Sequence, residues 1–517
     1  MTGWMGRKLE DFGELLPAEK RVATEMGHGQ VVIINPGLPP ENAEQKYHLR
    51  ASFVRYLALG GCERLRPPDK GLRIWGAVIQ GDGPEGTITR GLDLEGSTPP
   101  GDLWLTRCRF ADQLLLRVCN GKNFGFDGSH FAQGIRADGL VAQGNVFLRN
   151  VTAKGALRLL GAKLGGDLDC EGASFEAVQD EGGAWGHAFS ADGLVAQGSV
   201  FLQRVTAKGA LRLVGAKLGG DLDCEGASFE VRGGAVALQL QNMEAKGTFL
   251  WRKGAKIKGV LSLDHARFGA ICDESDCWPK PDMLNLSQCE YGSFAGGKTP
   301  VSADARLRWL GLQKDVNATG FLPQPYEQCA KVLRAMGHGA DALKVLIEKD
   351  RLQRKASRVG LGWARRNSYR VADGLLGLVV DYGLSPLKAF AWLAAVALFS
   401  TVLFAAAYTG GAFKPNTIQV LRGDAWMDCA QNALPPQCYM STVEGVSYPD
   451  FNALAYSLDT LLPIVDLEMQ HYWIPDERTT FGALIRVALW LQIIAGWALS
   501  LLAVAGFSGL IKTDNTT

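Results

Sequence analysis

The sequence lacks the patterns that mark most enzymes and metalloproteins. Its seven histidines form no pair at i, i+4, and its eleven cysteines include no Cys-x-x-Cys pair. A metal site formed by Cys272, Cys277 and His265 is a minor alternative, because the spacing of these residues fits no common zinc pattern. The single Gly-x-Gly-x-x-Gly, at 81–86, leads into the strand-like TITRGLDL, so the helix of a dinucleotide-binding turn is missing. We therefore expect no enzyme activity, no cofactor and no metal.

An excess of charge of one sign is missing as well. The chain has 54 Lys and Arg against 53 Asp and Glu, a formal net charge of +1. Because no domain-wide basic surface is implied, we expect no general binding of nucleic acid. The first residues include no apolar stretch, so we expect no signal peptide. Single cysteines in the N-terminal part suit buried thiols in a reducing compartment.

Glycine, in contrast, is abundant, with 63 residues and no Gly-X-Y period. Residues 137–176 recur at 191–230 with four substitutions, and residues 247–268 are a weaker third copy. Two triplets of acids recur in these copies, and we expect a solvated outer face, with metal binding as the minor alternative. The triplets are Asp167, Asp169, Glu171 and Asp221, Asp223, Glu225.

A finer period of 11 residues lies inside each copy. Gly144, Gly155 and Gly166 each open a unit in which apolar residues alternate with others, as in the Gly-x-Leu-x-Leu at 155–159, which is typical of a strand with one buried face. An 11-residue unit cannot bury its apolar face alone, so the units must stack. The fold class we predict is mainly β repeat, a pentapeptide-like parallel β-helix over 71–300 with ~22 residues and two units per coil.

The segments that flank this β-helix have their own signals. Residues 1–70 are expected to form an N-terminal segment with a helical cap, and 301–356 a helical linker. In the linker, Pro325 and Gly337 bound periodic stretches that predict an αα-hairpin like a single tetratricopeptide-type unit. We interpret one such unit as a spacer or an oligomer contact more readily than as a peptide receptor.

Basic residues gather before the first long apolar run. Residues 344–370 contain nine Lys and Arg against two acids, and 357–383 form a juxtamembrane segment. Such charges hold a segment in the cytoplasm or bind anionic lipid head groups, and the two roles are compatible. The residues assigned to lipid are Arg351, Arg354, Lys355, Arg358, Arg365, Arg366 and Arg370.

Two apolar runs predict a transmembrane domain at 384–517. The spans are about 386–407 and 484–510, each long enough for the ~20 residues that a bilayer requires. The loop at 409–480 holds nine acids and three Lys or Arg, so we expect it to face outward and both termini to be cytoplasmic at a bacterial inner membrane. In that loop, Cys429 and Cys438 either form a disulfide or stay free.

Between the spans lies the apolar run YSLDTLLPIVD, at 456–466. A re-entrant half-helix at about 451–464 gives the plan of two-transmembrane channels, but 461–470 has no glycine, so a potassium filter is not supported. A ring of carboxylates at such a position would attract cations. Asp459 is costly inside the half-helix, and Arg486 is its natural partner. The candidate pore residues are Asp459, Pro463, Asp466, Glu468 and Arg486.

The chain resembles a group of bacterial inner-membrane proteins that join a pentapeptide-like β-helix to a channel-like two-helix tail. Three motifs of the chain carry this resemblance: the GxLxLxGAxF units, PYEQ…LRAMGH…A…VLI and YSLDTLLPIVDL…YW. Some of its members are labelled membrane-associated oxidoreductases, and no cofactor motif here supports that label.

Two functions fit these features. The first is an oligomeric, channel-like or membrane-effector protein with a cytoplasmic β-helix that senses or binds. The alternative is a membrane-tethered β-helix scaffold that recruits a partner and conducts no ions. The expected partners are membrane lipids, further copies of the chain and a protein bound to the β-helix. One copy with two spans cannot enclose a pore, so the first function requires an oligomer.

Overall fold

The computed structural model of the protein describes residues 8–26, 30–61, 65, 67–82, 91–178, 186–313, 321–357 and 386–507. The chain divides into two compact units, Met1–Ala356 and Ser357–Thr517. The first unit contains stacked parallel sheets and the second contains two long apolar helices, in agreement with the coarse fold class predicted from the sequence.

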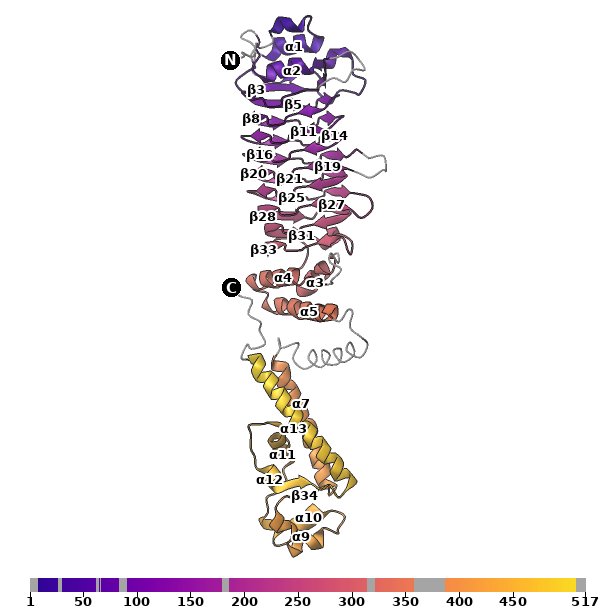
Figure 1. Ribbon diagram of the computed structural model, residues 1–517, viewed down its shortest axis with the longest axis vertical. Helices are drawn as coiled ribbons and strands as arrows, with labels where there is room; N and C mark the ends of the chain where they lie inside the picture. The colour runs from indigo at the N-terminus through magenta and orange to yellow at the C-terminus, as the bar shows by residue number, and fades with distance from the viewer. Residues whose placement is uncertain are drawn as a thin grey trace. The chain divides into compact units, whose positions relative to one another are not determined.

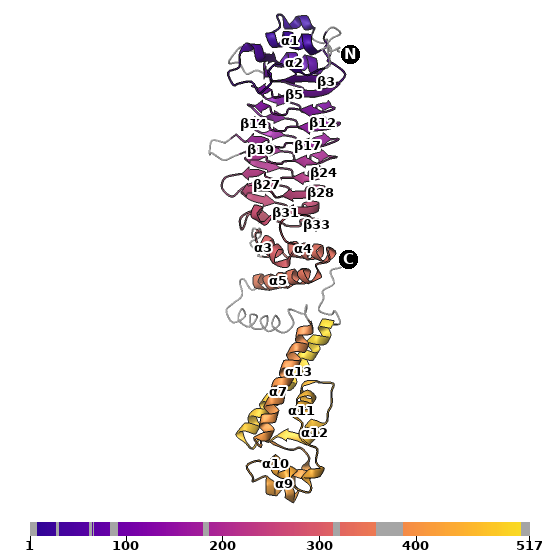
Figure 2. The same cartoon turned by 180° about the vertical axis from the view of Figure 1, so that it is seen from behind.

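Short parallel strands form a solenoid in the first unit, seen as successive layers in Figures 1 and 2. Its strands stand in four columns, two of which belong to the largest sheet. The first column contains β1 (Val32–Ile33), β3 (Gly71–Trp75), β5 (Asp102–Thr106), β9 (Phe124–Gly125), β13 (Val146–Phe147), β17 (Leu168–Asp169), β21 (Val200–Phe201) and β25 (Leu222–Asp223). The second contains β8 (Asn120–Gly121), β12 (Val141–Ala142), β16 (Lys163–Leu164), β20 (Val195–Ala196) and β24 (Lys217–Leu218).

Three longer strands, β28 (Glu244–Trp251), β31 (Arg267–Asp273) and β33 (Glu290–Phe294), continue that sheet. The third column contains β2 (His48–Arg50), β4 (Val78–Gln80), β6 (Arg109–Phe110), β10 (His130–Phe131), β14 (Thr152–Lys154), β18 (Ser174–Glu176), β22 (Thr206–Lys208), β26 (Ser228–Glu230) and β29 (Lys256–Lys258). The fourth contains β7 (Leu114–Leu115), β11 (Ile135–Arg136), β15 (Leu157–Arg158), β19 (His187–Ser190), β23 (Ala210–Arg212), β27 (Val236–Gln239), β30 (Val260–Ser262) and β32 (Leu284–Asn285).

One coil of the solenoid has the length that the sequence predicts but twice the number of strands. Val146 pairs with Leu168, 22 positions further on, and Thr152 pairs with Ser174 at the same offset. Each 11-residue unit forms two short strands with a corner between them, so the coil has four strands, where one per unit was predicted. Val146 and Leu148 are both buried, and Leu148 lies at the corner after β13.

The glycines that open every second unit, such as Gly144, Gly166 and Gly198, leave room for a ladder of polar side chains. A Cβ at Gly166 would lie 1.9 Å from Oδ1 of Asn145, and one at Gly198 would lie 2.0 Å from Oδ1 of Asp167. The ladder oxygens each accept the N–H of a residue one coil further on. The pairs are Asn123 with Asn145 (2.8 Å), Asn145 with Asp167 (2.7 Å), Asp167 with Ser199 (2.7 Å), Ser199 with Asp221 (2.9 Å) and Asp221 with Thr248 (2.6 Å).

The prediction of a solvated outer face is wrong for Asp223 and Glu225, which are buried, whereas the other four acids are partly exposed. Asp167 and Asp221 belong to the ladder, while Asp223 and Glu225 are 6% and 8% exposed. Glu225 pairs with Arg252 and lies 2.5 Å from Nζ of Lys253. Burial would raise the pKa of Glu225, but hydrogen bonds from these two cations outweigh it and lower the pKa.

Helices lie at both ends of the first unit. At the N-terminal end are η1 (Leu9–Phe12), α1 (Pro17–Glu25), η3 (Gln45–Tyr47) and α2 (Ala51–Ala58). The buried carboxylate of Glu19 in α1 accepts 2.9 Å and 2.5 Å bonds from Arg50, which fixes α1 to β2. At the C-terminal end are η4 (Ser275–Cys277), α3 (Ala303–Leu310), α4 (Gln324–Ala335) and α5 (Gly339–Ser357). There, Arg306 of α3 bonds both oxygens of Asp273 at 3.0 Å, and both residues are buried.

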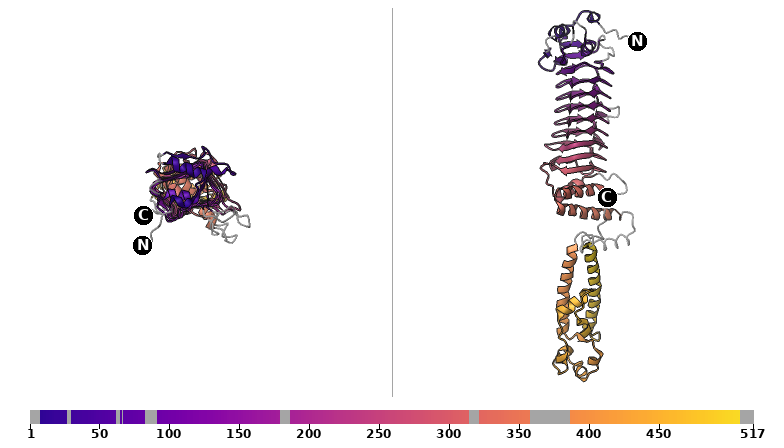
Figure 3. Two further views of the ribbon diagram at one scale, coloured as in Figure 1. Left: turned by 90° about the horizontal axis from the view of Figure 1, so that it is seen from above. Right: turned by 90° about the vertical axis from the view of Figure 1, so that its left-hand side faces the viewer.

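The second unit is built around α7 (Pro386–Thr409) and α13 (Thr480–Phe507), which pack together (Figure 3). Both helices are long and apolar enough to cross a membrane, over Lys388–Thr409 and Thr480–Val504, and only 28% of the apolar window of each is buried. Shorter elements lie between them in the chain: β34 (Phe413–Pro415), α8 (Ile418–Leu421), α9 (Asp424–Cys429), α10 (Pro435–Met440), η6 (Gly445–Ser447), α11 (Ala453–Leu461), α12 (Met469–Tyr472) and β35 (Trp473–Pro475).

Candidate functional site

The short helix α11 occupies the position of the predicted half-helix and packs on both α7 and α13. It begins after Asn452, whose side chain accepts the N–H groups of Leu454 and Ala455 at 3.1 Å and 3.0 Å. The predicted half-helix at 451–464 is too long, because α11 ends at Leu461. Leu462 precedes a proline and adopts an extended conformation, which stops the helix.

A buried polar junction joins α11 to both long helices. Ser457 of α11 contacts the hydroxyl of Ser400 and donates to the carbonyl of Ala397 at 3.0 Å, both on α7. Gln492 of α13 donates to the carbonyl of Ser457 at 2.9 Å and to the hydroxyl of Thr460 at 3.0 Å. In an apolar surrounding such bonds fix the position of the helix, because each unmade one costs about 1–3 kcal/mol.

The end of α11 touches α13 at a glycine. A Cβ on Gly496 would lie 1.8 Å from the carbonyl oxygen of Leu461, so no larger residue fits there without displacing α11. Gly496 follows Thr480 by 16 residues, which is about 24 Å along a helix. The half-helix therefore ends deep along the apolar part of α13.

Asp459 anchors the chain that leaves α11. Its two carboxylate oxygens accept the N–H groups of Leu467 at 2.6 Å and Gln470 at 2.9 Å. The side chain of Gln470 also donates to the carbonyl of Asp459 at 3.1 Å. A carboxylate that accepts backbone N–H groups at both oxygens is satisfied without a cation.

The pairing of Asp459 with Arg486 was predicted and is wrong. The Nε of Arg486 donates to Glu477 at 2.7 Å, just before α13 begins. The sequence suggested Arg486 because it lies near the start of the last helix, but the backbone amides eight and eleven residues after Asp459 come closer because the chain turns back.

The returning segment, residues 462–468, contains the remaining candidate pore residues. Residues 464–468 are all exposed, with Ile464 95% exposed. The carbonyls of residues 463–467 accept no hydrogen bond from the described part of the chain. Asp466 accepts the N–H of Glu468 at 2.9 Å, and Pro463 lines a cavity of about 300 Å³ with Asp459, Asp466 and others.

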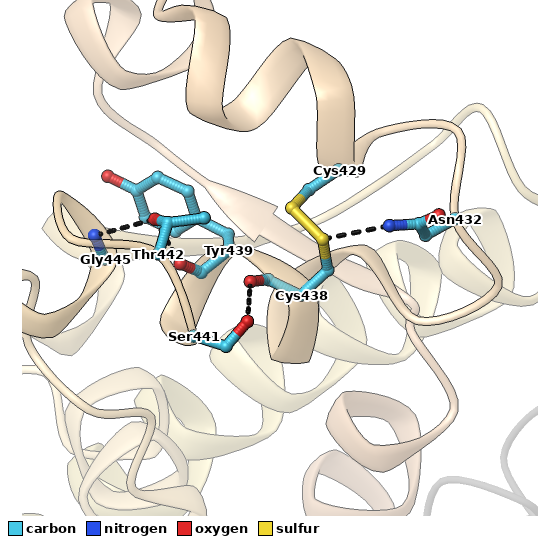
Figure 4. Close-up of a disulfide and its surroundings, with 7 residues drawn as sticks. All are labelled: Cys429, Asn432, Cys438, Tyr439, Ser441, Thr442 and Gly445. Carbon is cyan, nitrogen blue, oxygen red and sulfur yellow. Dashed lines mark hydrogen bonds between the residues drawn. A yellow bond between two sulfur atoms is a disulfide. The ribbon is translucent and has the colours of Figure 1, made fainter.

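Cys429 and Cys438 form a disulfide, one of the two states that the sequence left open (Figure 4). The bond joins the end of α9 to α10, and Asn432 donates to the sulfur of Cys438 at 2.9 Å. Trp426 and Tyr439 pack in the same cluster, with ring centroids 5.7 Å apart. The disulfide thus fixes the small helical region between the two long helices.

The residues assigned to lipid head groups are only partly described. Arg351, Arg354 and Lys355 lie in the last turns of α5, where Arg351 pairs with Glu348 at 3.4 Å. The others lie outside the described residues: Arg358, Arg365, Arg366 and Arg370. Residues 83–86 of the glycine motif also lie outside them.

The cysteines considered for a metal are buried in the solenoid. Cys277 accepts the indole N–H of Trp251 through its carbonyl at 2.6 Å, and His265 contacts Asp264 at 2.8 Å. Among the described residues, no group of three His, Cys, Asp or Glu side chains is placed to hold a metal ion.

None of the family models, curated proteins or solved structures compared with the chain matches it.

The residues that position α11 are not among those predicted from the sequence. They lie within apolar runs and are Ser400, Ser457, Gln492 and Gly496. Gln492 is the residue that could have indicated such a contact, because a side-chain amide inside an apolar span requires a hydrogen-bond partner. The close approach at Gly496 has no sequence signal, because small residues are common in such helices.

Proposed function

We propose that the protein is a membrane-embedded, channel-like protein that works as an oligomer. In this proposal the solenoid is a cytoplasmic, pentapeptide-like parallel β-helix that senses a signal or binds a partner. The single observation that supports it is the returning segment, residues 462–468. It starts about 24 Å along α13, and its carbonyls at 463–467 accept no hydrogen bond from the described residues. In lipid, such a backbone is tolerated only when it is buried in protein or lines a water-filled cavity.

Further copies of the chain would supply that cavity. With the exposed face of residues 464–468 turned toward a shared axis, water reaches the carbonyls and lipid does not. Asp466 and Glu468 are exposed there and add negative charge, which attracts cations. The absence of glycine at 461–470 supports an opening without potassium selectivity.

Two measurements on the full chain test this proposal. The mass of the protein in nanodiscs should correspond to more than two copies, and liposomes should pass small cations. Asp466→Asn should lower the preference for cations over anions. Asp428→Asn, an equal loss of charge on the exposed side of α9, should leave the preference unchanged. A monomer, or liposomes that pass no ions at any tested potential, would contradict the proposal.

The second candidate is a membrane-tethered scaffold that recruits a partner. Asp459 favours it, because both carboxylate oxygens hold the protein's own returning segment and neither is free for ions. A hairpin resting in the membrane interface needs the same anchor. For a scaffold, the first unit alone, residues 1–356, should capture the partner as tightly as the full chain does.

A further inference from the structure

The positive charges of the region between the long helices gather at one cavity. Residues 409–480 contain nine Asp and Glu and three Lys and Arg, and all of them are described. The three cations are Lys414, Arg422 and Arg478, and all three line a cavity of about 710 Å³. In a segment with this acidic excess, the meeting of every cation at one place makes the cavity a candidate site for an anion.

The fold brings these three residues together from distant parts of the chain. Lys414 lies in β34, which pairs with β35, and Arg478 follows β35 just before α13 begins. Arg422 follows α8. The hairpin of β34 and β35 thus holds Lys414 near Arg478, although 64 positions separate them in sequence.

Among the described residues, one carboxylate forms ion pairs with cations of this group of three. Asp476 lies 3.3 Å from Lys414 and 2.9 Å from Arg478. Burial would raise the pKa of Asp476, but hydrogen bonds from Arg478 and the charge of Lys414 outweigh it, so its pKa is lowered and it stays ionised. Arg422 is exposed and forms no ion pair with any described residue. Three cations against one carboxylate leave the cavity positive.

The cavity also has apolar lining residues. Leu421, Trp426 and Met427 line it, and Met427 is 56% exposed. Trp426 is only 3% exposed, because it packs in the cluster that contains the disulfide. Cations and apolar side chains that line the same cavity suit an anion that has an apolar body.

We propose that this cavity binds the phosphate head group of an anionic phospholipid at the outward membrane surface. Lys414 follows the end of α7 by five residues and Arg478 precedes α13 by two, so both lie at the boundary of the apolar spans. Arginine and lysine bind phosphate through charge-assisted hydrogen bonds, and tryptophan favours this boundary. The inference rests on the membrane insertion of α7 and α13 in the proposed function.

Lipid retention by the full chain in nanodiscs tests the inference. Native mass spectrometry should find phosphatidylglycerol retained in preference to phosphatidylcholine. Arg422→Gln should reduce that preference about tenfold, the equivalent of one charged hydrogen bond. Arg422→Lys keeps the charge and should stay within about threefold of the parent protein. An intact disulfide between Cys429 and Cys438 in each variant confirms that the region is folded.

The outcomes separate the inference from the proposed function. Equal retention of the two lipids by a correctly inserted protein, or an Arg422→Gln variant that behaves as the parent does, would overturn the inference alone. Glycerol phosphate that displaces phosphatidylglycerol at equal concentration would assign the site to a soluble phosphate and overturn the lipid assignment. A chain that does not enter bilayers at all would overturn both.

Discussion

In the solenoid the same polar bond recurs from coil to coil, whereas in the second unit each polar bond occurs once. Asn145 and Asp167 each accept an N–H from the next coil, and their neighbours above and below do the same. Ser457 and Gln492 join three helices with bonds that do not recur at regular intervals among the described residues. When a bond recurs in every coil, the loss of one copy leaves the bonds of the other coils in place. A bond that occurs once, such as the one from Gln492 to Ser457, fixes the position of a single helix.

The close contacts at glycines also recur in the solenoid and occur singly at α11. In the solenoid, close approach recurs at Gly166, Gly198 and equivalent positions. In the second unit, Gly496 lets the carbonyl of Leu461 approach α13. A change in the solenoid should therefore alter stability locally, and a change at the α11 contacts should alter function.

The largest effect on stability is expected from Arg306→Ala. It leaves the buried Asp273 without its cation, which costs about 3–5 kcal/mol. Because each coil contacts only its neighbours, loss of structure should be confined to the last coils and α3. Hydrogen exchange measures this, and the exposed Arg308→Ala on the same helix is the control. Unfolding of all coils together would show that the solenoid is not modular.

Gly496→Ala should have the largest effect on the second unit. Its new Cβ would displace α11, at a cost of about 1–3 kcal/mol for overpacking. We expect ion flux to fall at least tenfold and exchange to rise in Ala453–Leu461. Gly161→Ala in the solenoid is the matched control, since nothing lies within 4 Å of its Cβ and only its φ of +63° is strained. Normal ion flux in Gly496→Ala would show that the position of α11 does not control conduction.

Asp459→Asn should loosen the returning segment. The amide keeps one acceptor oxygen and loses the charge, so the bonds to Leu467 and Gln470 weaken by about 1–3 kcal/mol together. The amides of these two residues should exchange faster and the ion flux should change. Asp450→Asn, an exposed acid just before α11, serves as control. Equal flux and equal exchange in both variants would show that Asp459 is not an anchor.

Asn145→Ala tests the repeated bond. The N–H of Asp167 loses its acceptor, which costs about 1 kcal/mol. Chemical denaturation should show this small loss, with faster exchange at Asp167 alone. The exposed Gln143→Ala is the control. A loss of several kcal/mol would mean that the ladder is cooperative along its length.

The smallest expected effect is the pH dependence of the region around Asp476. The pKa of Asp476 is lowered in the folded protein. Its contribution to the stability of the fold is therefore fully present above its pKa in the unfolded chain, about 4, and is lost as the pH falls through its pKa in the folded protein. Stability of this region should decline in acid, and Asp476→Asn should remove that part of the decline. An unchanged acid profile in the variant would show that Asp476 does not contribute.

The periodic parts of the fold could be predicted from the sequence, because burial repeats there at fixed intervals. The 22-residue coil and both apolar helices follow from such patterns. The length of α11 was wrong because the restraint that Pro463 places on Leu462 was not applied. The anchoring of Asp459 could not be predicted, because it depends on a chain reversal that only the packed helices determine.

The most direct test of the proposed function is a thiol placed at the exposed Ile464. In the solenoid, burial raises the pKa of Cys108 to about 12, and all the described free cysteines are buried, so they should not react. Cys62 lies outside the described residues and is replaced by serine in every variant. A water-soluble cationic thiol reagent should then stop cation flux through Ile464→Cys liposomes. Ile494→Cys, on the exposed face of α13, should conduct unchanged after the same treatment. Full labelling of Ile464→Cys with no change in flux would contradict a pore lined by the returning segment.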